Sequence, residues 1–102
     1  MYKLIITDLA QEDLDGIIEY IAIDLANATA ATDFLVKVHE SYGYLKTNPY
    51  IYAPVEDRRL AKEGYRKALI KNYILVFKID EKTKTTTIYR FFYAARDYFK
   101  YL

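Results

Sequence analysis

The residues with the greatest chemical capacity in this 102-residue chain are cations and tyrosines in its second half. Five cations lie on or beside apolar segments that are rich in aromatic residues: Arg66, Lys67, Lys71, Arg90 and Arg96. Arginine and lysine bind carboxylates and phosphates, and tyrosine rings stack on bases or pack against apolar groups. This combination predicts a surface for an anionic partner, either a nucleic acid or an acidic protein segment.

Net charge is distributed unevenly along the chain. The first 45 residues hold two basic and eight acidic residues, a net charge of −6, whereas residues 46–102 hold thirteen basic and six acidic residues, a net charge of +7. The sequence therefore predicts one acidic and one basic part of the fold. The alternative is that the two parts neutralise each other where they pack together.

Composition excludes several kinds of site. Cysteine is absent and His39 is the single histidine, so neither a disulfide framework nor a Cys or His metal cluster can form. The glycines are scattered, which leaves no glycine-rich loop to cradle a phosphate. We therefore expect no metal and no cofactor, and we expect His39 to be a packing or surface residue. No signal peptide or membrane-spanning run is visible, so a cytoplasmic protein is expected.

The elements that position these residues follow from hydrophobic periodicity. Residues 2–7 alternate loosely and predict a strand. A helix capped by Asp8 follows, and a second helix begins after Asn27 and ends near Thr47, since Pro49 disfavours helical geometry at the preceding residue. The short connection predicts an antiparallel helical hairpin whose apolar stripes cover a sheet.

Three more strands are predicted after an irregular segment at 48–64. This segment can accommodate a short helix around residues 57–62. The predicted strands span residues 65–71, 73–79 and 85–93. The middle strand is apolar on both faces, which predicts a central position in the sheet. Strict alternation in the last strand places Ile88, Arg90 and Phe92 on one face. Residues 94–102 are expected to form a terminal turn.

These elements predict a single α+β domain over residues 1–102. Its order is β-α-α-β-β-β, with the N-terminal strand followed by an antiparallel helical hairpin that packs on a mainly antiparallel sheet. The apolar content of 53% is sufficient for a core of this size.

In this order and length, the chain resembles the RelE/ParE superfamily of bacterial type II toxins. Three pieces carry the resemblance: Tyr2 to Thr7 with Ala10, Asp13-Leu14 and Glu19-Tyr20-Ile21; Gly64 to Lys67 leading to Asn72 to Phe77; and Arg90 to Asp97. The resemblance implies growth inhibition, a role in plasmid stabilization and a cognate antitoxin as partner. It also implies that operator DNA is contacted only through the antitoxin, and that no membrane is involved.

The superfamily divides by target, and the chain is more similar to one branch. YoeB-like members carry an arginine opening the middle strand and a His-Tyr pair near the end of the last strand, where this chain has Tyr73 and Phe92-Tyr93. ParE-like members end that strand with an arginine, two apolar residues, a histidine and a small-small-Arg-Asp run. Arg90 to Asp97 matches the ParE-like pattern, with Tyr93 in place of the histidine.

Each branch implies its own site residues. A ParE-like toxin inhibits DNA gyrase by binding, and its target-binding residues would be Arg66, Arg90, Arg96 and Tyr93. A RelE-like toxin is a metal-independent endoribonuclease that cleaves ribosome-bound mRNA, and its catalytic set would be Tyr93, Arg90, Lys67 and Lys71. Cleavage through the 2′-hydroxyl needs proton transfer and cations near the phosphate. We expect the non-enzymatic toxin, with the nuclease and an inactive antitoxin-binding homologue as alternatives.

Three of these residues also have structural interpretations. Arg96 can form an ion pair with Asp97 that fixes the terminal turn. Arg90 lies between aromatic residues, so it can either stack on a ring or bind phosphate. Tyr93 can be an aromatic residue at the rim of the sheet with no role in proton transfer.

Overall fold

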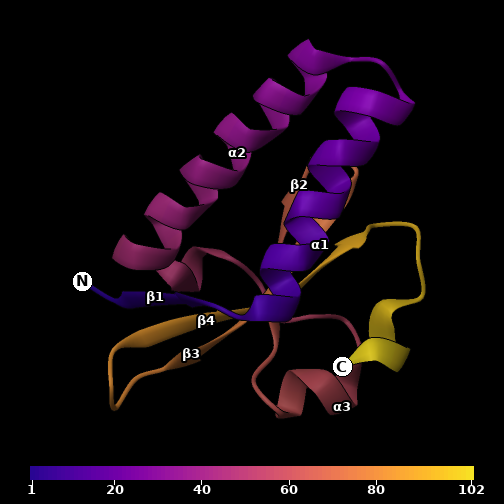
Figure 1. Cartoon of the computed structure of the whole chain (residues 1–102). Coiled ribbons are helices and arrows are strands. Elements are labelled where there is room, and N and C mark those ends of the chain that lie inside the picture. Colours follow the sequence, from indigo (N-terminus) through magenta and orange to yellow (C-terminus); the bar gives the residue numbers. More distant parts are fainter.

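The computed structural model describes all 102 residues, and its elements follow the predicted order (Figure 1). The strands are β1 (Lys3–Ile6), β2 (Arg66–Ile70), β3 (Tyr73–Asp80) and β4 (Thr85–Tyr93). The helices are α1 (Asp8–Glu19), α2 (Ala28–Thr47) and α3 (Arg58–Lys62), with a π-helical turn at Tyr20–Asp24 and 3-10 helices at Pro49–Ile51 and Tyr98–Tyr101. The α+β prediction is confirmed, including the short helix and the terminal turn. None of the helices combines the length and hydrophobicity that crossing a membrane requires.

The four strands form one mixed sheet in the order β1-β4-β3-β2. β1 runs parallel to β4, whereas β3 is antiparallel to both β4 and β2. The central position of β3 agrees with its two apolar faces. The turn between β2 and β3 contains Lys71, whose φ of 55° lies in the left-handed region.

The start of α1 differs from the prediction by one residue. Thr7, and not Asp8, is the N-cap: its hydroxyl accepts from the Ala10 N–H at 3.1 Å and donates to the Tyr89 carbonyl at 3.0 Å. Thr7 retains extended backbone geometry and Asp8 is already helical, where its charge favours the positive end of the helix dipole. The predicted cap of α2 is confirmed, because the Asn27 side chain accepts from the Ala30 N–H at 3.0 Å.

The two long helices form an antiparallel hairpin that covers one face of the sheet (Figure 1). Their apolar stripes and that face enclose a core of 13 buried residues, which includes Leu14, Phe34, Val38, Leu75 and Phe77. Burial of each large apolar side chain contributes about 1.5–3 kcal/mol. The helices are therefore the backing layer that the sequence predicted.

The opposite face of the sheet is covered by shorter segments. Leu60 of α3 and Tyr98 of the C-terminal 3-10 helix are buried there against Ile74, Val76 and Phe92. The Tyr98 and Phe92 rings stack with centroids 5.6 Å apart and planes inclined by 19°. Sequence periodicity did not assign this cover, because α3 and the 3-10 helix are too short to show an apolar stripe.

A β-bulge in β4 changes the faces on which its side chains lie, relative to the prediction. Ile88 and Arg90 lie opposite consecutive residues of β3, which leaves Tyr89 as the extra residue. Since a bulge breaks the alternation of faces, Ile88 and Phe91 both join the core under the helices, whereas Phe92 lies on the opposite face. The prediction that Ile88 shares a face with Phe92 is therefore wrong.

Candidate functional site

Two of the predicted site residues are bound to the irregular segment that precedes β2. The Arg66 Nε donates to the Tyr52 carbonyl at 3.0 Å, and its guanidinium carbon lies 5.2 Å from the Tyr50 ring centroid. The Lys67 ammonium forms an ion pair with Glu56, which lowers the pKa of that carboxyl. Both cations therefore hold the segment against the sheet.

Arg90 is engaged by a carboxylate that the sequence analysis did not connect with it. Its Nε and Nη2 donate to the two Asp13 carboxylate oxygens at 2.7 and 3.1 Å, and the Phe91 N–H donates to the same carboxylate at 3.0 Å. The two side chains are only 20% and 18% exposed. The hydrogen bond with Asp13 raises the pKa of Arg90. This pair joins α1 to β4 across 77 positions of sequence, and no local pattern could have indicated it.

The stacking interpretation of Arg90 is confirmed, since its guanidinium carbon lies 4.8 Å from the Phe92 ring centroid.

The contacts of Arg96 differ from the ion pair with Asp97 that the sequence suggested. Its guanidinium lies 4.2 Å from the Tyr101 ring centroid and forms no ion pair with Asp97. A hydrogen bond from Arg96 lowers the pKa of the Tyr101 hydroxyl. Arg96 is exposed and remains accessible to a partner.

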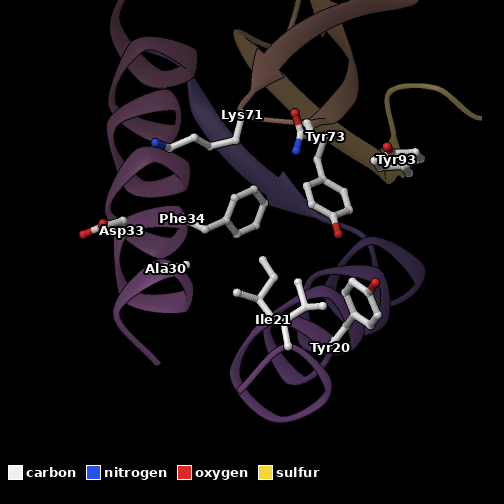
Figure 2. Close-up of a pocket in the computed structure, with 10 residues that line it drawn as sticks. Tyr20, Ile21, Ala30, Asp33, Phe34, Lys71, Tyr73 and Tyr93 are labelled. Atoms are coloured by element: carbon white, nitrogen blue, oxygen red, sulfur yellow. The ribbon is translucent and has the colours of Figure 1, made fainter. Parts of the chain in front are cut away.

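Tyr93 and Lys71 lie at a cavity of about 710 Å³ between the helical hairpin and the β2–β3 turn (Figure 2). Its wall includes Tyr20 at the end of α1, Phe34 of α2 and Tyr73 at the start of β3. The Tyr73 ring contacts Phe34 and Tyr93 in edge-to-face geometry, with centroids 5.3 and 5.7 Å apart. Burial raises the pKa of Tyr73, so its hydroxyl stays neutral.

A second hollow of about 350 Å³ adjoins this cavity along α1 and shares Tyr20, Tyr73 and Tyr93 with it. It extends to Arg96, in the turn that follows β4. We call the two hollows together the tyrosine groove. Tyr93 is 51% exposed and Tyr20 is 46% exposed, so the groove offers aromatic surface with Lys71 at one end and Arg96 at the other.

The structure separates the residues that a nuclease would need. Lys67 and Arg90 lie on the sheet face covered by α3, and each is paired with a carboxylate. Lys71 and Tyr93 line the cavity beside the helical hairpin. In Figure 2 the Lys71 amine points towards α2 and away from Tyr93. The arrangement presents an aromatic groove, and Lys67, Arg90, Lys71 and Tyr93 do not converge on one point.

The fold and this groove together describe a small α+β protein with a helical hairpin on a mixed sheet and a tyrosine-rich groove. The family model described as "ParE toxin of type II toxin-antitoxin system, parDE" matches residues 4–98. The chain therefore belongs to the ParE toxin family, within the RelE/ParE superfamily that the sequence resembles. No curated protein matches the sequence.

Among solved structures, the chromosomal ParDE TA system from P. aeruginosa is similar to this chain with a TM-score of 0.69 and 21% sequence identity, and the match covers 91% of this chain and 96% of that chain. The toxin–antitoxin complex RelBE2 from Mycobacterium tuberculosis gives a TM-score of 0.49 and 18% identity, with 90% and 96% coverage. The similarity to the P. aeruginosa chain supports the fold.

Proposed function

We propose that this protein is the toxin of a type II toxin–antitoxin pair and that it inhibits growth by binding an essential target. Membership of the ParE family supports this class of function and makes DNA gyrase the expected target. We further propose that a cognate antitoxin neutralises it. The match to a chain of the P. aeruginosa ParDE system is consistent with such a partner.

The separation of the candidate catalytic residues carries the proposal. Cleavage of RNA proceeds through a phosphorane-like transition state that needs cations and proton-transfer groups at one point. The Arg90 guanidinium is held by Asp13 at 2.7 Å, and the Lys67 ammonium is held by Glu56 on the sheet face opposite Tyr93. Withdrawing these charges would cost a nuclease about a hundredfold to a thousandfold in rate for each lost contact. A binding toxin has no such requirement.

The tyrosine groove is the proposed contact surface for the target. Tyrosines supply large, rigid contact area and are enriched among the residues that dominate binding energy at interfaces. Arg96 and Lys71 at the two ends of the groove would add attraction for carboxylates or phosphates of the target. Arg66 and Arg90 are committed within the fold, so we propose Tyr93 and Arg96 as the contacting members of the predicted set.

The decisive experiment measures two activities of the purified protein. We expect inhibition of gyrase supercoiling and no ribosome-dependent cleavage of mRNA. Tyr93→Ala should weaken inhibition about tenfold or more, as expected for an interface anchor. Tyr44→Ala is the matched control, because Tyr44 is 52% exposed, like Tyr93, and lies outside the groove. Messenger RNA cleavage that disappears in Tyr93→Phe would instead establish the endoribonuclease.

The antitoxin part of the proposal has its own test. The product of the gene adjacent to this one should form a stable complex with the protein and restore growth when both are expressed. If neither complex nor rescue is observed while the protein alone arrests growth, the toxin activity stands and the proposed partner is wrong.

A further inference from the structure

Lys71 adopts a backbone conformation that is uncommon for lysine. Three residues other than glycine have a positive φ, and two of them have a local reason for it. Ala26 reverses the chain between the two long helices, and the Lys84 ammonium forms an ion pair with Glu81 and lies 5.2 Å from the Tyr2 ring centroid. Lys71, with a φ of 55° in the β2–β3 turn, forms no ion pair and stacks on no ring. Since glycine adopts such a φ without steric conflict, lysine lowers the stability of this turn.

The Lys71 ammonium is a free cation beside the cavity of about 710 Å³. Arg96, the other cation of the tyrosine groove, already lies over the Tyr101 ring. In Figure 2 the Lys71 side chain extends towards α2, and the Asp33 carboxylate points away from the cavity. Strained backbone conformations concentrate at functional sites. A strained residue whose charge serves no contact within the fold is therefore a candidate for contact with a partner.

The cavity beside Lys71 has a mostly apolar wall with aromatic rings around it. Ile21 and Leu25 line it together with Phe34, which is only 2% exposed. In Figure 2 the Tyr73 hydroxyl points towards Ile21 and Tyr20. Cavities that enclose a small ligand measure about 300–1,000 Å³, so this one has room for a large side chain. An aromatic side chain would pack edge-to-face against these rings, and a polar group on its edge would reach the Tyr73 hydroxyl.

The acidic residues of the groove restrict which anion Lys71 can bind. Asp33 lines the cavity and Glu12 lines the adjoining hollow, and neither forms an ion pair. A nucleic acid carries a negative charge on every nucleotide, so its backbone would meet these two carboxylates as well as Lys71. One carboxylate on a protein segment needs only one cation. A protein partner with an isolated acidic residue is therefore the better match.

We propose that this cavity anchors the target through an aromatic side chain, and that Lys71 binds a carboxylate two residues away from that side chain. Alternate side chains of an extended segment lie on the same side of the chain, so one segment of this spacing reaches both the cavity and Lys71. The inference rests on the proposed function, because it specifies the chemistry of the gyrase segment that meets the tyrosine groove.

Gyrase inhibition tests the role of Lys71. Lys71→Glu should weaken inhibition about tenfold, or about 1.4 kcal/mol, whereas Lys71→Arg should retain it. The matched control Lys82→Glu makes the same charge change at an exposed lysine outside the groove and should have little effect. Lys71→Gly should also weaken inhibition, while its Tm stays at or above that of the wild type because glycine relieves the strained φ. A lysine that served only the turn would not give this combination.

A peptide tests the same chemistry without gyrase. The probe is a labelled seven-residue peptide with a tryptophan two residues after an aspartate. The wild-type protein should bind it, and replacing its aspartate with asparagine should weaken that binding about tenfold. The same replacement should not change binding to Lys71→Gly, as expected when two groups contact each other. Replacing the tryptophan with alanine should abolish binding to both proteins.

The outcomes separate this inference from the proposed function. Equal loss of gyrase inhibition in Lys71→Glu and Lys82→Glu would overturn the inference and leave gyrase as the target. Coupled loss of peptide binding without any gyrase inhibition would support the chemistry of the cavity and overturn gyrase as its partner. If Lys71→Glu weakens only the complex with the product of the adjacent gene, the occupant is the antitoxin and the inference is wrong. Displacement of the peptide by a single-stranded DNA oligonucleotide would also overturn it, in favour of a nucleic acid.

Discussion

The replacement Asp13→Ala should destabilise the protein more than any other single change of a charged residue in α1. Three hydrogen bonds converge on this carboxylate, at 2.7 and 3.1 Å from the Arg90 guanidinium and at 3.0 Å from the Phe91 N–H. Removing the carboxylate leaves a cation that is 20% exposed without its counter-ion. It also removes the partner of a backbone donor beside the core.

The size of the effect follows from these contacts. A hydrogen bond to a charged group contributes about 1.5–3 kcal/mol, and breaking a fully buried pair costs about 3–5 kcal/mol. Because Asp13 and Arg90 are about one-fifth exposed, water compensates part of the loss, and we expect a decrease in unfolding free energy of about 3 kcal/mol. For a domain of this length that decrease lowers the Tm by roughly 12–24 °C.

Urea denaturation followed by circular dichroism measures the change, with Asp15→Ala as the control. Asp15 lies on the same helix but contacts only Gln11, so its removal should cost less than about 0.5 kcal/mol. A double-mutant cycle with Arg90→Ala should give a coupling energy of about 2 kcal/mol. The reasoning fails if Asp13→Ala is no more destabilising than Asp15→Ala, or if the coupling energy is close to zero.

Three further outcomes are expected. Tyr93→Phe removes only a hydroxyl, so growth inhibition should persist, whereas a nuclease that used this group would lose about two to four orders of magnitude in rate. Burial raises the pKa of Tyr42 from 10.0 to about 12 in the folded protein. The contribution of the buried, neutral Tyr42 to stability is therefore complete below pH 10 and is lost as pH rises towards 12. Tyr42→Phe should reduce this alkaline loss in urea titrations. Thr7→Ala removes the cap of α1 and should lower unfolding free energy by about 1 kcal/mol. The control Thr32→Ala, on the exposed surface of α2, should cause no loss, because alanine favours a helix more than threonine does.

Most elements could be predicted because their signals are local. Periodicity identified the four strands and the two long helices, and Pro49 marked the end of α2. The cap of α1 was misplaced by one residue, since Thr7 and Asp8 are both residues that favour this position. The choice between them depends on backbone geometry and on the Tyr89 carbonyl, which lies 82 positions away.

The candidate site could be predicted as a set of residue types but not as an arrangement. Arg90, Lys67, Lys71 and Tyr93 were all recognised, yet their faces could not be known. The bulge at Tyr89 shifts the side chains of β4 relative to strict alternation, and nothing in the residue types marks its position. Residue types alone do not show which side chains meet in the fold, so Asp13 and Glu56, the ion-pair partners of Arg90 and Lys67, were not predicted.

The sequence by itself determined the order of the elements, the polarity of the two halves and the family to which the chain is similar. These properties depend on residue type and short-range spacing, which are present in the unfolded chain. The tertiary structure decided which cations are paired and which remain accessible, and it formed the tyrosine groove. Those features require contacts between residues far apart in sequence, and such contacts exist only after the helices have packed on the sheet.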